Sequence, residues 1–361
     1  MSGSLREVNT AVIGGGQSGL AVGYYLARYD REFAIFDAND RIGDAWRHRW
    51  DSLRLFIQAR YSSLPGLSFP APEDHFPTKD EVADYLETYA LTFELPVCLE
   101  TTVKILSQRN GRYVVEVATG GESRRVAAEN VVVATGGFTT PNVPPFNDAL
   151  DPAIMRFHSS AYRNPDQTPE GPALVVGAGN AGAEIATELA ASGRRTFLSG
   201  PETGSIPLGV FNNRPFWWLG RNVITADSWL CEKIEQRSRA RGDPLVRLTE
   251  PEIRQAGVER VARTQGVENG KPVLNGERPL DVASVVWATG FQPDYEWIDL
   301  PRLRFDEGGY PVHERGAVPE QPGLYFIGLP YQSTVVSASL GGIGADAQHV
   351  VDHLRNNCPP D

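Results

Sequence analysis

The sequence predicts an α/β fold with two Rossmann-like dinucleotide-binding domains, the second inserted into the first and each carrying a small β-meander. Three features support this fold class. Glycine-rich turns occur twice, as GGGQSG at 14–19 and GAGNAG at 177–182, and each follows a short apolar run and precedes a helical pattern. Two later strands both end in Ala-Thr-Gly, at 134–136 and 288–290. One nucleotide-binding design is therefore present in two copies.

The first copy begins with a complete βαβ unit. Residues 10–13 form the predicted first strand, 17–29 the first helix and 33–36 the second strand, which ends at Asp37. A carboxylate in that place can accept hydrogen bonds from an adenosine ribose, and it would repel a 2′-phosphate. The first copy is therefore expected to bind FAD or NAD.

A helix and a run of short strands follow. The sequence Thr-Lys-Asp-Glu is a capping box, and apolar residues at helical spacing after it predict a helix over 79–94. Short β segments at 103–107, 112–118 and 125–127, separated by tight turns, predict a small meander. The apolar run VVVATGGF, 131–138, predicts a buried strand that ends at the first Ala-Thr-Gly.

The second copy repeats this order. Residues 173–176 and 196–198 are its predicted strands, with a helix between them that ends near residue 192. A long excursion containing FNNRPFWWLG follows, and a second meander then begins at 260–267 and leads into VVWATGF, 285–291.

The order of the elements divides the chain into three segments. Residues 1–165 are expected to form the first part of an FAD-binding domain and 166–290 an NAD(P)H-binding domain. Residues 291–361 are too few for a further domain and are expected to complete the first one. At 361 residues the chain is long enough for two domains, each with its own core.

The composition narrows the class of ligand. The formal net charge of -11 argues against nucleic acid or an anionic membrane surface, because polyphosphate binding relies on clustered Lys and Arg. Cys98, Cys231 and Cys358 are far apart and form no C-x-x-C, so neither a disulfide framework nor a redox-active dithiol is expected. The histidines show no metal-ligand spacing. We expect a cytoplasmic enzyme without a targeting signal that acts on a small-molecule substrate. The sequence leaves the oligomeric state open, with a homodimer among the possible assemblies.

The two glycine turns are expected to hold different nucleotides. The predicted binding residues are Gly14, Gly16, Gln17, Ser18 and Gly19 in the first turn and Gly177, Gly179, Asn180 and Gly182 in the second. The second copy lacks an acid at the end of its second strand, where Ser199 stands, and Arg214 lies downstream, so both NADPH and NADH are permitted. Gly136 and Gly290 in the Ala-Thr-Gly triplets would let the chain pass close to the cofactors. A resident flavin and a visiting nicotinamide could then exchange hydride between stacked rings.

Together these motifs resemble the flavin-containing monooxygenases, in their small bacterial branch, within the two-dinucleotide-domain flavoproteins. The resemblance covers nearly the whole chain. Besides the glycine turns and the Ala-Thr-Gly strands, it rests on RIGDAWRHRWDSLRLF at 41–56, FHSSAYRNP at 157–165 and PGLYFIGLP at 322–330. It implies FAD as the bound cofactor and NADPH or NADH as the reductant.

The resemblance also implies cofactor contacts outside the two turns. Ala45 and Trp46 lie in the segment that contacts the flavin in that family. Gly328 lies in the last shared motif. Gly341 lies in the stretch 340–354, which resembles the helix whose N-terminus points at the flavin pyrimidine.

Candidates for catalytic roles follow from the same resemblance. His158 matches the histidine of the family's linker signature, F-x-G-x-x-x-H, although Pro152 and Ile154 stand at the phenylalanine and glycine positions. Gln58 and Arg60 are the nearest polar residues to the place where the family puts an asparagine over the flavin.

The implied activity is that of an FAD-dependent NAD(P)H monooxygenase, which inserts one oxygen atom of O2 into a sulfide, amine or ketone through a C4a-hydroperoxyflavin. The alternative is a flavoprotein reductase that passes electrons to a quinone, ferredoxin or other acceptor, and the departure from the linker signature favours it slightly. A third hypothesis is a redox-sensing flavoprotein that contacts a partner through Phe216, Trp217 and Trp218.

Overall fold

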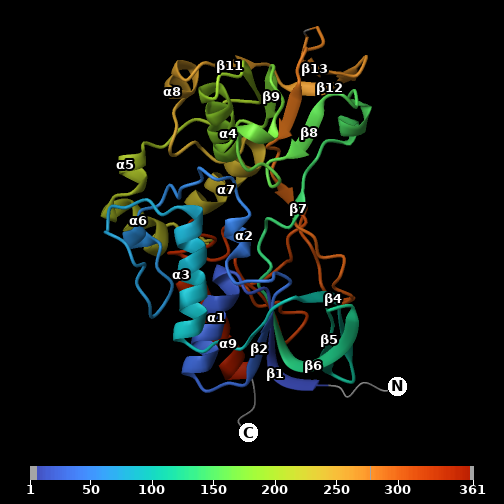
Figure 1. Cartoon of the computed structure of the whole chain (residues 1–361). Helices are drawn as coiled ribbons and strands as arrows, with labels where there is room; N and C mark the ends of the chain where they lie inside the picture. Colours follow the sequence, from blue (N-terminus) through green and yellow to red (C-terminus); the bar gives the residue numbers. More distant parts are fainter. Residues whose placement is uncertain (1–5, 277, 358–361) are drawn as a thin grey trace.

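The computed structural model describes residues 6–276 and 278–357, which form two units, each built on its own sheet (Figure 1). The lower unit in the figure contains a seven-stranded sheet with the order β3-β2-β1-β6-β5-β4, in which β16 also pairs with β6. Its strands are β1 (Arg6–Ile13), β2 (Phe33–Phe36), β3 (Val97–Cys98), β4 (Thr101–Arg109), β5 (Arg112–Thr119), β6 (Glu122–Val133) and β16 (Leu324–Phe326).

The strand β6 joins a parallel half of this sheet to an antiparallel half. β1 pairs in parallel with β2 and with β6, and β16 pairs in parallel with the end of β6. The beginning of β6 pairs with β5, which pairs with β4, and these antiparallel strands form the predicted meander. The segment predicted at 125–127 and the beginning of the one predicted at 131–138 therefore belong to one long strand, whose two ends have different partners. This strand ends at Val133, before the Ala-Thr-Gly triplet.

Three helices cover one face of the sheet. They are α1 (Gln17–Arg28), α3 (Lys79–Thr92) and α9 (Ile343–Asn357). Val12 and Ile35 pack against these helices, whereas Ile13 and Phe36, one residue further along each strand, lie in the core on the opposite face. The C-terminal α9, red in Figure 1, packs along the N-terminal α1. The predicted insertion of the second dinucleotide-binding unit into the first is therefore confirmed.

The upper unit contains a five-stranded parallel sheet with the order β11-β10-β9-β14-β8. Its strands are β8 (Met155–His158), β9 (Ala173–Val176), β10 (Thr196–Ser199), β11 (Val258–Val261) and β14 (Ser284–Trp287). The helix α4 (Asn180–Ala191) connects β9 to β10 and packs against both. This βαβ unit is the second Rossmann-like copy.

The excursion after β10 is helical, and α7 (Trp229–Arg241) is the longest of its helices. Further elements are α2 (Asp44–Arg47), α5 (Leu208–Phe211), α6 (Arg214–Asn222), α8 (Glu250–Gln255), the 3-10 turns η1 (Ala59–Tyr61), η2 (Pro145–Ala149) and η3 (Pro165–Gln167), and the hairpin β12 (Thr264–Glu268) with β13 (Lys271–Leu274). The second copy has this hairpin where the sequence predicts a meander. The difference arises because β11, the strand expected to start the meander, pairs in parallel with β10 instead.

The chain crosses between the units along two linkers. β7 (Thr140–Pro141) and β15 (Phe291–Gln292) pair antiparallel at the crossing, between the two sheets in Figure 1. The domain boundaries at residues 165 and 290 stay a prediction, and β8 belongs to the upper sheet although it precedes residue 166. Within the described ranges 6–276 and 278–357, none of the helices combines the length and apolarity needed to cross a bilayer.

Candidate functional site

The first glycine turn lies at the carboxyl end of β1, where α/β sheets bind dinucleotides. Gly14 has a φ of 108°, and a Cβ there would lie 2.6 Å from the carbonyl oxygen of Ala134. Gly19 lies against the Gly14 carbonyl, so that only a hydrogen fits at that position. Gly16 is the N-cap of α1, makes no side-chain cap and would have nothing within 4 Å of an added Cβ. The uncapped N-terminus of α1 is therefore open, which fits the pyrophosphate of a dinucleotide.

Asp37 ties this turn to the end of β2. Its Oδ2 accepts a hydrogen bond from the Gly15 N–H at 2.5 Å. Its Oδ1 accepts from the backbone N–H and from the side-chain amide of Asn39, both at 2.8 Å. Three donors thus fix the carboxylate beside the first glycine turn, and Asp37 is 9% exposed. The sequence predicts that this carboxylate accepts hydrogen bonds from a ribose.

The returning C-terminal segment lies beside the first turn. Gln17 donates from Nε2 to the carbonyl oxygen of Ala338 at 3.0 Å. A Cβ at Gly328, where φ is 82°, would collide with the Ser18 hydroxyl. Gly341 lies further along and approaches the backbone of η1 so closely that a Cβ would collide with a carbonyl oxygen there. Glycines at 328 and 341 therefore permit two close approaches that larger residues would block.

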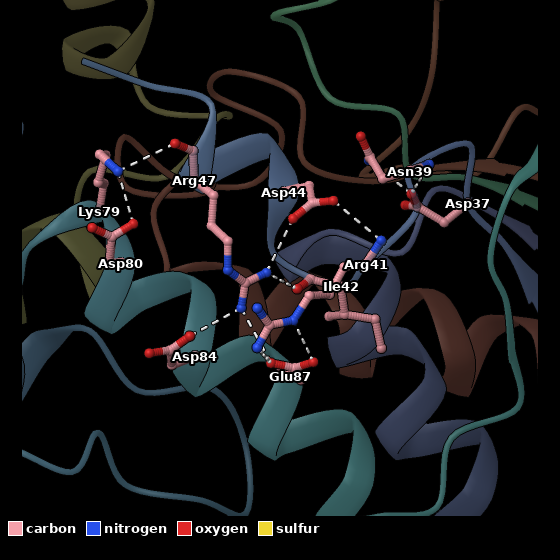
Figure 2. A network of polar contacts seen from close by, with 10 residues as sticks. All are labelled: Asp37, Asn39, Arg41, Ile42, Asp44, Arg47, Lys79, Asp80, Asp84 and Glu87. Carbon is pink, nitrogen blue, oxygen red and sulfur yellow. Dashed lines mark hydrogen bonds and ion pairs between the residues drawn. The ribbon is translucent and has the colours of Figure 1, made fainter. Parts of the chain in front are cut away.

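A network of ion pairs fixes the chain between β2 and α3, as Figure 2 shows. The Arg47 guanidinium pairs with the carboxylates of Asp44, Asp84 and Glu87 at 3.2, 3.0 and 3.1 Å. Arg41 donates to both oxygens of Glu87, at 2.8 and 2.5 Å. These hydrogen bonds and the two positive charges hold the pKa of Glu87 below its usual value. The segment 41–47 is thereby held against α3.

This network positions the predicted flavin-contact segment. Gly43 has a φ of 90°, and a Cβ there would lie 2.6 Å from the Ala83 carbonyl oxygen, so α2 contacts α3 directly. Trp46 is partly buried and packs against the core beneath α1, while Ala45 is exposed. The indole is therefore held against the core of the lower unit.

The second glycine turn repeats the geometry of the first. Gly177 has a φ of 109° and lies against the Ala288 carbonyl, and Gly182 lies against the carbonyl of Gly177. Gly179 is the N-cap of α4, again without a side-chain cap and with nothing within 4 Å of an added Cβ. The N-terminus of α4 is consequently open to a second pyrophosphate.

Three other residues are predicted to bind the second nucleotide, and each has its own surroundings in the structure. The Asn180 amide donates to the Pro244 carbonyl at 3.1 Å and accepts from the Val246 N–H at 3.0 Å, so its side chain holds a neighbouring loop. The Ser199 hydroxyl is fully buried and makes hydrogen bonds at the end of the sheet with residues 262 and 264. Arg214 is the first residue of α6 and is exposed.

The loop that carries Gln58 and Arg60 is attached to the upper unit through Asn212. The Gln58 N–H donates to Asn212 Oδ1 at 2.8 Å, and Asn212 Nδ2 donates to the Phe56 carbonyl at 2.9 Å. Gln58 is partly buried. Arg60 is exposed and donates to the Glu73 carbonyl at 3.1 Å, so its guanidinium is occupied outside the loop. Sequence reasoning missed Asn212, whose only signal was its place in the long polar and aromatic excursion.

His158 connects the end of β8 to the second linker. Its Nε2 lies 2.9 Å from the Gly290 carbonyl oxygen, which can only accept, so Nε2 carries the proton. Its Nδ1 then accepts from the hydroxyl and the N–H of Ser160, at 3.0 and 3.2 Å. Burial, with the nearby charge of Arg49, lowers the pKa of the imidazole. His158 is thus a neutral bridge, and Gly136 and Gly290, with φ of 73° and 80°, occur where the two linkers begin.

Arg49 is the second residue that sequence reasoning missed. Its guanidinium lies 5.8 and 5.6 Å from the ring centroids of Phe138 and Phe291, which follow the two Ala-Thr-Gly triplets. Its Nε donates to the Ala45 carbonyl at 3.2 Å. Burial, with the charge of Arg163, lowers the pKa of Arg49. Cation–π contacts contribute about 0.5–1 kcal/mol each, whereas desolvating an ion costs several kcal/mol, so the rings offset only part of that cost.

Comparison with known proteins agrees with this geometry. The sequence model of the pyridine nucleotide-disulphide oxidoreductase family matches residues 11–205. A CzcO-like uncharacterized oxidoreductase from Geobacillus kaustophilus is 41% identical over 355 residues, which make up 97% of this chain and 99% of the relative. A probable indole-3-pyruvate monooxygenase of Arabidopsis thaliana, YUCCA8, is 25% identical over 95% of this chain and 88% of its own length.

Among solved structures, the flavin-containing monooxygenase from Stenotrophomonas maltophilia superimposes with a TM-score of 0.76 at 25% sequence identity. The match covers 98% of this chain and 100% of that structure. The predicted fold class and the predicted relationship to flavin-containing monooxygenases are therefore confirmed. By its sequence model and its 41% identical relative, this chain belongs to the pyridine nucleotide-disulphide oxidoreductase family.

Proposed function

We propose that the protein is an FAD-dependent NAD(P)H monooxygenase that inserts one oxygen atom of O2 into a small organic substrate, such as a sulfide, an amine or a ketone. One observation carries the proposal: the helices α1 and α4 both present open, uncapped N-termini, at Gly16 and Gly179, on two separate sheets joined by paired linkers. A protein that binds one dinucleotide needs only one such end.

The residues around the first turn fit FAD. The N-terminus of α1 would hold the pyrophosphate, Asp37 would accept from the adenosine ribose, and Trp46 and Gly341 would border the flavin. The second turn and the N-terminus of α4 would hold NADPH or NADH. When bound, the flavin supplies the hydride acceptor and the group that reacts with O2.

The residues of the chain itself would bind and orient the two nucleotides and exclude water from the site. Asn212 holds the loop of Gln58 against the upper unit. His158, protonated at Nε2, fixes the carbonyl of Gly290 where the second linker begins. We assign Gln58 the polar position nearest the flavin, and we assign Arg60 no role because its guanidinium is bound to Glu73.

The names of two of the relatives support oxygen insertion. The 25% identical plant protein is a probable indole-3-pyruvate monooxygenase, and the bacterial structure of the same identity is a flavin-containing monooxygenase. Disulfide reduction needs a reactive cysteine pair. Cys98 and Cys231 are free cysteines, and Cys358 lies outside the described residues.

A reductase without oxygen insertion is the second candidate, because Pro152 and Ile154 replace the phenylalanine and glycine of the linker signature. The redox-sensor hypothesis is weaker. Of its three aromatic residues, Trp217 is buried and stacks on Tyr61 at 4.9 Å, Phe216 is partly buried, and Trp218 is exposed.

Isotopic labelling separates the two enzyme candidates. The FAD-loaded protein is supplied with NADPH or NADH, isotopically heavy O2 and a panel of aryl sulfides, tertiary amines and cyclic ketones. A monooxygenase gives a product that carries one heavy oxygen atom. In a parallel reaction, a quinone is added as electron acceptor. If the reduced nucleotide is consumed with the quinone and none of the substrates gains heavy oxygen, the protein is the reductase and the proposal is refuted.

A further inference from the structure

Arg49 comes from the lower unit's part of the sequence but lies against the upper unit. The next residue, Trp50, is 7% exposed and belongs to the core around α4 and β9. The N–H of Asp51 donates to the carbonyl of Arg163, which follows β8, at 2.7 Å. The segment after α2 therefore carries Arg49 to the upper sheet.

Arg49 reaches the edge of that sheet where the second glycine turn lies. β9 and β14 are parallel neighbours that end at Val176 and Trp287, so the segments that follow them share one edge. Gly177 and Ala288 are in such close contact that a Cβ on Gly177 would collide with the Ala288 carbonyl. The Arg49 guanidinium lies 5.6 Å from the ring of Phe291, three residues beyond Ala288.

In the described parts of the chain, the Arg49 guanidinium forms no ion pair with a carboxylate. Its contacts there are the Ala45 carbonyl oxygen and the two aromatic rings. The charge that perturbs its pKa is another cation, Arg163. His158, which also feels the charge of Arg49, is neutral in the hydrogen-bonding arrangement described above. A partly buried guanidinium in such surroundings is matched to an anion supplied by a ligand.

We propose that Arg49 binds the pyrophosphate of the nicotinamide nucleotide, across from the N-terminus of α4. This inference rests on the proposed function, and it adds a cation from the lower unit to the nucleotide site of the upper unit. The pyrophosphate is favoured over a ribose 2′-phosphate because of the strand order. A 2′-phosphate would lie at the end of β10, whereas Arg49 is beside the segment after β14, on the other side of β9.

The test measures binding to oxidised, FAD-loaded protein by calorimetric titration, so that no turnover is needed. Arg49→Met is expected to raise Kd about tenfold for NADP+, NAD+ and ADP-ribose alike, since all three carry the pyrophosphate. Arg49→Lys keeps the positive charge and is therefore expected to raise Kd by a smaller factor. The flavin-to-protein absorbance ratio is expected to stay unchanged, because the first turn is untouched.

Arg156→Met is the matched control. Arg156 is also partly buried in the upper unit and donates to backbone carbonyls, at 3.4 and 3.3 Å, but these lie before β8 at the opposite edge of the sheet. Its Kd values are expected to equal those of the parent.

The outcomes are distinguishable. An unchanged Kd in Arg49→Met would overturn this inference and leave the proposed function standing. A rise in Kd for NADP+ only would also overturn it, because Arg49 would then bind the 2′-phosphate. So would a rise in Kd that spares ADP-ribose, because Arg49 would then contact the nicotinamide. If the parent protein bound none of these nucleotides, the proposed function would fail first. If Arg49→Met did not fold, the same comparison in Arg49→Lys would decide.

Discussion

Replacement of Gly179 by alanine separates the binding role of the second turn from its role in the fold. Gly179 has φ −75° and ψ −175°, which alanine adopts without strain, and an added Cβ meets nothing within 4 Å. Alanine at an N-cap is less favourable than glycine by several tenths to about 1 kcal/mol. Alanine also lowers the conformational entropy of the unfolded chain, which stabilises the folded protein by about 0.4–1 kcal/mol. The free energy of unfolding should therefore change by less than about 1 kcal/mol.

Nucleotide binding should change far more. The new methyl group would occupy the open space at the N-terminus of α4, which the pyrophosphate must approach closely. Loss of one hydrogen bond to a charged group costs about 1.5–3 kcal/mol, which is a rise in Kd of about tenfold to hundredfold. Calorimetric titration with NADP+ and NAD+ measures this change, and a thermal melt with a flavin absorbance ratio measures the fold and the first site.

Gly16→Ala is the mirror experiment, because Gly16 has φ −77° and the same open surroundings at α1. It should lose flavin while the apoprotein still folds. The reasoning is refuted if Gly179→Ala binds both nucleotides as tightly as the parent, or if it loses flavin and Gly16→Ala keeps it. Gly14 and Gly177 are unsuitable for this comparison, since a Cβ at either collides with backbone atoms.

Three further predictions concern stability. Asn212→Ala leaves the Gln58 N–H and the Phe56 carbonyl without their partner, and urea unfolding should show a loss of about 1–3 kcal/mol; an unchanged midpoint would contradict the bridging role. Arg47→Met removes the cation that pairs with Asp44 and Asp84, while Glu87 keeps Arg41, so the free energy of unfolding should fall by about 2–3 kcal/mol. Arg47→Lys should recover less than half of this loss. Burial raises the pKa of Glu184 from 4.5 to about 7, against the attraction of Arg247 at 3.8 Å. The folded state therefore holds this proton more tightly, and the resulting stability is full below pH 4.5 and lost as the pH rises to about 7. Glu184→Gln should remove that pH dependence and stabilise the protein by about 3 kcal/mol above pH 7, and equal melting curves for parent and variant at every pH would contradict this.

Local signals predicted most of the secondary structure around the two turns. The first helix and the second strand occur as predicted to within one residue, since glycine spacing and apolar alternation act over a few residues. The first strand is present but begins at Arg6, before the predicted start at residue 10. The capping box also forms: Thr78 Oγ accepts from the Glu81 N–H at 3.2 Å, and the Glu81 carboxylate accepts from the Thr78 N–H at 2.7 Å. The helix it begins ends at Thr92, two residues before the predicted end.

The features that were not predicted depend on contacts between distant parts of the chain. β11 joins the parallel sheet because β10 offers it an edge, and a strand's own residues do not say which edge it will meet. Asn212 is separated by 154 residues from Gln58, the residue whose N–H it accepts. Arg49 stands in an ordinary polar stretch of sequence, and its significance appears only when the two linkers bring Phe138 and Phe291 to its sides.

The central claim is that FAD and the nicotinamide nucleotide bind at two separate sites and that their reactive rings come into contact. The most direct test is to mix the purified protein with NADPH and with NADH under anaerobic conditions. The protein is expected to be yellow, and its flavin absorbance should disappear in a single phase whose rate saturates with nucleotide concentration. A colourless protein that takes up no added FAD, or a bound flavin that stays oxidised with both nucleotides, would contradict the proposed arrangement.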